Sequence, residues 1–169
     1  MNPLIRQIIS FIRSVGIEVS FSLLDETCFL PGITIQEGKI LIDIDRLKYP
    51  GDLLHEAGHI AVVPLAERSS LDSDSISQRP ERAAEEMMAM AWSYAAGRHI
   101  GIDPEIIFHG DGYQGGGSNL LQSFETNSPI GAPMLQYHGM CYFGKHATEA
   151  GVEPYPAMLH WTNPAALKV

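Results

Sequence analysis

Two histidines four residues apart, His55 and His59, are the part of the sequence best suited to chemistry. On an α-helix, residues at this spacing lie on one face, with their Cβ atoms roughly 5–6 Å apart. Each imidazole can then give one nitrogen to the same zinc ion, at about 2.0–2.1 Å. Glu56 follows the first histidine, where a carboxylate can act as the general base on metal-activated water. The pattern H-E-x-x-H therefore predicts a metal site with Glu56 as its catalytic residue.

The residues around this motif predict the helix that it requires. Apolar residues precede and follow it, from Leu53 to Val63. Asp52 is suited to cap the start of a helix, and Pro64 is suited to end it. This context argues against a chance match to a short motif.

A third protein ligand is expected, because a catalytic zinc usually has three and keeps one position open. A helix predicted from Pro80 to Gly97 offers Glu81 and Glu85, four residues apart on one face. We expect Glu81 to bind the metal and Glu85 to accept the free N–H of a ligand histidine as a second-shell partner. Glu86 is the main alternative ligand, and solvent-exposed glutamates remain a further alternative. Apolar residues along this helix favour close packing on the metal helix: Ala83, Ala84, Met87, Met88, Ala91, Trp92 and Ala95.

These two segments together resemble a known family. The combination of H-E-x-G-H at residues 55–59 with E-x-x-A-E at residues 81–85 is similar to the gluzincin metallopeptidases, especially the ImmA/IrrE type. The resemblance covers about residues 1–97, and it implies that His55, His59 and Glu81 bind zinc and that Glu56 is the base.

The chain departs from this family at three points. Glu85 stands where the family usually has Asn or Asp. The sequence from Trp92 to Gly97 replaces the family's Leu-Leu-Met-Pro ending of the second helix. No helix-turn-helix or sensor domain is evident, so a regulatory role does not follow from the resemblance.

The remaining patterns predict an α+β fold. An amphipathic helix from Pro3 to Val15 is followed by a strand from Ile17 to Phe21. Two β-branched runs, 33–35 and 39–44, flank Gly38 and predict a β-hairpin. We expect a single zincin-like metallopeptidase domain over residues 1–169, with a metal-site core at 1–97 and accessory helices and coil at 98–169. Its small antiparallel sheet should pack beside the metal helix and the second ligand-bearing helix.

The strand at 39–44 leads directly into the metal helix and should lie beside the zinc. If one edge of this strand is open, an extended peptide can add to it as a further strand. The hypothesis predicts that this edge binds the substrate; a purely structural hairpin is the alternative.

The composition excludes several classes of partner. The formal net charge of −9 leaves no basic footprint for nucleic acid. The chain has no run of 18 apolar residues, so we expect no membrane span. Its first residues lack the pattern of a signal peptide. Cys28 and Cys141 make no disulfide framework, which favours a cytoplasmic protein with free thiols.

These observations predict a Zn²⁺-dependent peptidase, or a related amide hydrolase, acting on protein or peptide substrates. The alternative is a zinc-containing regulatory or binding module without proteolytic activity. Candidate donors to the oxyanion of the tetrahedral intermediate are Tyr113 and His109, followed by His138 and His160. The sequence predicts no oligomeric state.

Overall fold

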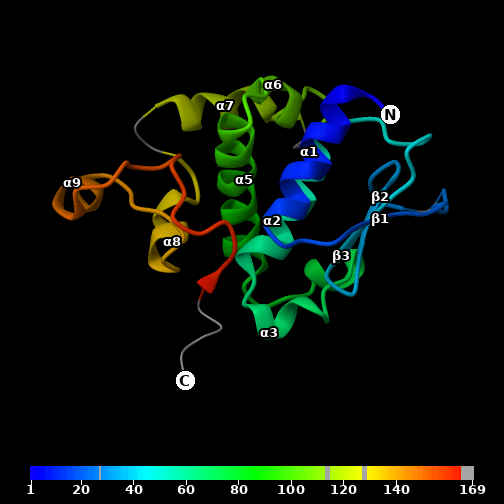
Figure 1. The fold of residues 1–169 in the computed structure, drawn as a ribbon, viewed down its shortest axis with the longest axis horizontal. Helices are drawn as coiled ribbons and strands as arrows, with labels where there is room; N and C mark the ends of the chain where they lie inside the picture. Colours follow the sequence, from blue (N-terminus) through cyan, green and yellow to red (C-terminus); the bar gives the residue numbers. More distant parts are fainter. Residues whose placement is uncertain (27, 113–114, 127–128, 165–169) are drawn as a thin grey trace.

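Helices α2 (Asp52–Val62) and α5 (Arg82–His99) lie side by side at the centre of the computed structural model (Figure 1). The structure describes the chain except for residues 27, 113–114, 127–128 and 165–169. Helix α1 (Pro3–Ser14) packs on α2, as its apolar face predicts. Figure 1 shows the sheet on the side of α1 and α2, with α8 and α9 beyond α5.

A small sheet stands next to α2 and confirms the α+β fold class. In the described part of the chain it has three strands in the order β1-β3-β2: β1 (Val19–Phe21), β2 (Ile33–Gln36) and β3 (Lys39–Ile42). Strands β2 and β3 form the predicted antiparallel hairpin. Strand β1, however, runs parallel to β3, so the sheet is mixed rather than antiparallel. The long connection from β1 to β2 allows this direction, which no local pattern could reveal.

Strand β3 is the central strand, which overturns the hypothesis that a peptide adds to it. The amide of Ile40 donates to the carbonyl of Glu18 at 2.9 Å, on the side of β1. The opposite edge of β3 is paired with β2. Both edges are therefore covered by the protein itself.

The outer edge of β2 is also engaged, by the segment between α2 and α5. The amide of Ile35 donates to Ser73 Oγ at 2.8 Å, and the amide of Glu37 donates to Asp72 Oδ1 at 2.9 Å. This segment contains the single-turn helices α3 (Leu65–Arg68) and α4 (Ser73–Ile76).

The ends of the two central helices differ slightly from the prediction. Gly51, not Asp52, caps α2, and Asp52 occupies its first turn. Helix α5 begins at Arg82, with Glu81 as its N-cap residue.

The C-terminal part of the chain packs on α5 and on the end of α2. Trp92 Nε1 donates to the carbonyl of Trp161 at 2.8 Å, and the Tyr155 hydroxyl donates to the carbonyl of Ala91 at 2.9 Å. Asn163 Nδ2 donates to the carbonyl of Val62 at 2.7 Å. The helices in this part are α6 (Pro104–Ile107), α7 (Gly117–Glu125), α8 (Ala132–Tyr137) and α9 (Lys145–Ala150).

Helices α6 to α9 lie in the region 98–169, where accessory helices and coil were expected. One hydrophobic cluster contains buried side chains from both residues 1–97 and residues 98–169, and it extends from α1 to Tyr155. Within the described ranges, no helix is long and apolar enough to cross a membrane.

Candidate metal centre

Helix α2 directs the imidazoles of His55 and His59 to a common point. Their Nε2 atoms are 3.1 Å apart, and the rings are nearly perpendicular, at 82°. The two side chains are 13% and 8% exposed, so the site is largely shielded from solvent. Together with Glu56, they form a group whose ligand atoms all lie within 4.8 Å of one another.

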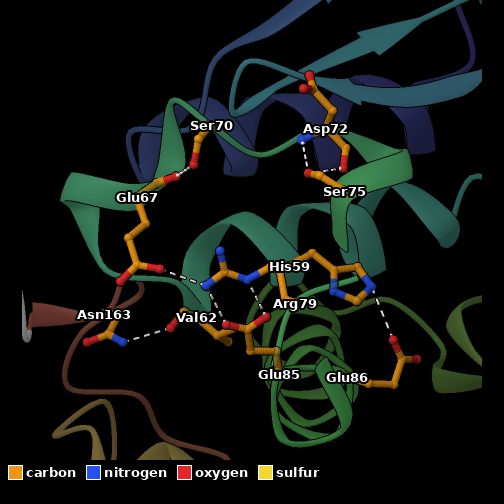
Figure 2. A network of polar contacts seen from close by, with 10 residues as sticks. All are labelled: His59, Val62, Glu67, Ser70, Asp72, Ser75, Arg79, Glu85, Glu86 and Asn163. Atoms are coloured by element: carbon orange, nitrogen blue, oxygen red, sulfur yellow. Dashed lines mark hydrogen bonds and ion pairs between the residues drawn. The ribbon is translucent and has the colours of Figure 1, made fainter. Parts of the chain in front are cut away.

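A carboxylate from α5 completes this arrangement. Glu86 places Oε1 at 3.4 Å from His55 Nε2 and Oε2 at 3.3 Å from His59 Nε2; Figure 2 shows the second of these contacts. Ligand atoms around a tetrahedral zinc with bonds of 2.0–2.1 Å are separated by about 3.3–3.4 Å. The separations of 3.1, 3.3 and 3.4 Å are close to this spacing, with each oxygen of Glu86 facing one of the two histidines. Two imidazoles and one carboxylate are also the ligand types that zinc takes, so these side chains could hold the ion.

The structure thus brings Glu86, and not Glu81, to the two histidines. Glu81 is the exposed N-cap residue of α5. Five residues turn a helix by about 140° beyond a full turn, so the two side chains cannot face the same way. The geometry therefore favours Glu86, the alternative that the sequence left open, as the candidate third ligand.

A signal for Glu86 is present in the sequence, although it is ambiguous. The spacing E-x-x-A occurs at Glu81 with Ala84 and again at Glu86 with Ala89. Ala84 is half-buried, whereas Ala89 is fully buried on the face that meets α2. Only the packing of the helix distinguishes the two registers.

Glu85 has a different partner from the one predicted. Arg79 Nε lies 2.7 Å from Glu85 Oε2, and Arg79 Nη2 lies 2.8 Å from Glu85 Oε1. The same Nη2 lies 2.8 Å from Glu67 Oε2, as Figure 2 shows. Both oxygens of Glu85 therefore meet a guanidinium, where the sequence predicted an imidazole.

Glu56 is buried beside the histidines, and this sets its acidity. Burial raises the pKa of Glu56 to about 7, because water no longer stabilises the carboxylate. The nearby charge of His55 opposes this shift, whereas the charges of Asp52 and Glu86 add to it. A base whose pKa lies near neutrality is suited to accept and release a proton at physiological pH.

The three proposed ligands are also shifted in acidity. Burial, followed by the charge of His55, lowers the pKa of His59 to about 3, so that this imidazole is neutral. Burial alone would lower the pKa of His55, but the hydrogen bond and charge of Glu86 outweigh it and raise the pKa. Burial would raise the pKa of Glu86, but His55 more than offsets this and lowers it. A ligand histidine must be neutral, so a metal ion would compete with a proton for His55, whose pKa is raised.

A second polar pair lies one turn before the metal ligands. His109 Nε2 is 2.9 Å from Asp52 Oδ1, and the ring of Tyr49 stacks on His109 with a centroid separation of 3.8 Å. The Nδ1 atom of His109 is buried and has no hydrogen-bond partner among the residues that the structure describes. His109 therefore adjoins the centre through Asp52, whose charge acts on both His55 and Glu56.

The other predicted oxyanion donors gain no support from the geometry. Tyr113 lies outside the described residues. His138 packs on Tyr137, and His160 is exposed. Among the contacts of the described chain, none joins either histidine to the metal centre.

Comparisons with known proteins do not add to this description. No protein-family model matches the chain, and neither the curated proteins nor the solved structures contain a significant match.

Proposed function

We propose that the chain is a zinc-dependent peptidase that hydrolyses amide bonds with Glu56 as the general base. The observation that carries this proposal is the convergence of His55 Nε2, His59 Nε2 and the Glu86 carboxylate at separations of 3.1–3.4 Å. The buried Glu56, with its pKa near 7, lies beside these donors. Its presence favours hydrolysis, because a metal site that only stabilises a fold has no need of a base.

Each residue has a distinct part in this chemistry. His55, His59 and Glu86 would hold the ion, leaving one position open. Zinc, when bound, supplies a Lewis acid that lowers the pKa of water to about 7 and polarises the scissile carbonyl. Glu56 accepts the proton of the attacking water at its carboxylate and passes it to the nitrogen of the leaving amine.

The proposed setting is the cytoplasm, and the proposed substrates are proteins or peptides. Cys28 and Cys141 are free thiols, as expected in a reducing compartment. The proposal also keeps the likeness to ImmA/IrrE-type gluzincins, now with Glu86-Met87-Met88-Ala89 as the second pattern. Met90 then stands where that family has Asn or Asp.

The test begins with the full chain expressed with added zinc. Elemental analysis should give about one zinc per chain. The protein should then cleave unfolded or native test proteins, with the new N-termini identified by mass spectrometry. A chelator should stop cleavage, zinc should restore it, and Glu56→Gln should retain zinc while slowing cleavage by about 10²–10⁴-fold.

Two results would contradict the proposal in different ways. A chain that takes up no zinc would remove its basis. Zinc uptake without cleavage, with no difference between the wild type and Glu56→Gln, would favour the alternative of a zinc-containing regulatory or binding module.

A further inference from the structure

Arg79 links the two polypeptide segments that border the metal centre. Its side chain is only 16% exposed, and the guanidinium holds both oxygens of Glu85, near the start of α5. It also contacts Glu67 on α3, shortly after the end of α2. Figure 2 shows the three side chains in a row beneath α3. Arg79 thus connects the segment that leaves α2 with the helix that carries Glu86.

Besides its packing on α2 through Gly58 and Ala89, the start of α5 is held by few polar side-chain contacts in the described chain, one of which joins Arg82 Nη1 to the carbonyl of Ser77 at 2.7 Å. Glu81, its N-cap residue, makes no side-chain capping hydrogen bond. Glu86 is itself 44% exposed, so packing alone does not hold its carboxylate in place. In contrast, Glu85 is buried and bound at both oxygens. Neighbouring residues on a helix differ by about 100° in direction, so fixing Glu85 also fixes the direction of Glu86.

We propose that Arg79 is a positioning residue for the metal centre, which holds Glu86 against His55 and His59 through its two-point contact with Glu85. The inference rests on the proposed function in one respect, namely that this centre binds zinc. Ligand atoms must lie within about 0.2 Å of their ideal distances, so a small rotation of α5 weakens the site.

If Arg79 has only a structural role, the expected results are different. Arg79 could serve only to neutralise Glu85, since a buried carboxylate without a partner is strongly destabilising. Restoring neutrality by other means would then restore zinc binding. The double variant Arg79→Met/Glu85→Met tests this, because replacing a buried ion pair with apolar residues is often tolerated. Arg79→Lys keeps the charge but cannot hold both oxygens of a carboxylate in the same planar geometry.

The experiment measures zinc affinity in the full chain by competition with a chromophoric chelator. The absorption of Co²⁺ in the same site reports the coordination geometry, and thermal unfolding of the metal-free protein reports the fold. We expect zinc binding to weaken about 10–100-fold in the double variant and about 10-fold in Arg79→Lys, as is usual for residues that orient ligands. The Co²⁺ spectrum should change in both, while cooperative unfolding is retained. Glu67→Gln is the matched control: it removes the other partner of Arg79, and its zinc affinity should stay within about twofold of the wild type.

Two outcomes would overturn the inference. A folded double variant with wild-type zinc affinity and Co²⁺ spectrum would show that Arg79 only neutralises Glu85. A loss in Glu67→Gln as large as that in Arg79→Lys would assign the effect to the link with α3 instead. A wild-type chain without zinc would contradict the proposed function itself, and is distinguished by elemental analysis before any variant is made.

Discussion

Gly58 and Ala89 bring the backbones of α2 and α5 into direct contact. A Cβ atom added at Gly58 would lie 2.8 Å from the carbonyl oxygen of Ala89 and 3.0 Å from its Cα. Gly58 immediately precedes the proposed ligand His59, and Ala89 lies about one turn after Glu86. The absence of a side chain at residue 58 therefore sets how closely the carboxylate approaches the imidazoles.

Replacing Gly58 with alanine should separate the two helices. In a helix interior this change normally stabilises by roughly 1 kcal/mol. Here the added methyl group meets backbone atoms that cannot rotate away, and overpacking of this kind costs about 1–3 kcal/mol. We expect no net stabilisation in urea unfolding of the metal-free protein, together with weaker zinc binding. A clearly more stable variant with unchanged zinc affinity would contradict the close contact.

The assignment of the third ligand can be tested with a pair of variants. Glu86→Ala removes the carboxylate that contacts both Nε2 atoms, so zinc affinity should fall by at least about 100-fold, more than for a residue that only orients a ligand. Glu81→Ala changes an exposed residue of the same type on the same helix, and zinc affinity should be unchanged. Titration with a chromophoric chelator measures both. The reverse result would restore the assignment made from the sequence.

The site residues that could be predicted from the sequence all lie on one helix, α2. His55, Glu56 and His59 share a single helical face, so their spacing defines their geometry. Glu86 depends on how a second helix is rotated, and the repeated E-x-x-A spacing permits two rotations. The contact between Gly58 and Ala89 selects one of them, and it joins residues 31 positions apart.

The difference between local patterns and contacts of distant segments also explains why the strand order of the sheet was not predicted. The hairpin of β2 and β3 was predicted because its turn is local and Gly38 adopts a positive φ. Strand β3 is central because β1 pairs with it, and β1 is separated from β3 in the sequence by the whole of β2 and the connection before it. The partners of Glu85 and Ile35, namely Arg79 and Ser73, come from a polar segment without periodicity. The conformation of this segment follows from its contacts with β2 and α5, which its own sequence does not reveal.

Ser73 should control the local opening of the outer edge of β2. Its hydroxyl oxygen accepts the Ile35 amide at 2.8 Å, and Ser73→Ala removes this acceptor. Loss of one such hydrogen bond costs about 1 kcal/mol, so hydrogen exchange of the Ile35 amide should quicken by roughly 5–10-fold. Ser70→Ala is the control, because the Ser70 hydroxyl donates only to the nearby carbonyl of Glu67. Equal exchange at Ile35 in the two variants would show that Ser73 does not secure this edge.

The buried Glu56 should make the stability of the metal-free protein depend on pH. Burial raises the pKa of Glu56 from 4.5 to about 7 in the folded chain. Between these values the folded state holds a proton that the unfolded state has released, so the free energy of unfolding falls as pH rises. The stabilisation is fully present below about pH 4.5 and is lost by about pH 7. His59, with its pKa lowered to about 3, acts in the opposite sense between about pH 3 and 6.5.

Glu56→Gln tests this contribution, because glutamine does not titrate, whereas His55 and His59 are present in both proteins. The charge of Glu56 also raises the pKa of His55, so the difference reports these two coupled groups together. The free energy of unfolding of the variant minus that of the wild type should therefore increase from pH 4.5 to pH 7. Each unit of pKa difference corresponds to about 1.4 kcal/mol, so the increase should amount to a few kcal/mol. Urea unfolding in the presence of a chelator, at several pH values across this window, measures the difference. The exposed Glu81→Gln serves as the control and should show a nearly constant difference. A constant difference for Glu56→Gln as well would mean that Glu56 is not held in a buried, proton-binding environment.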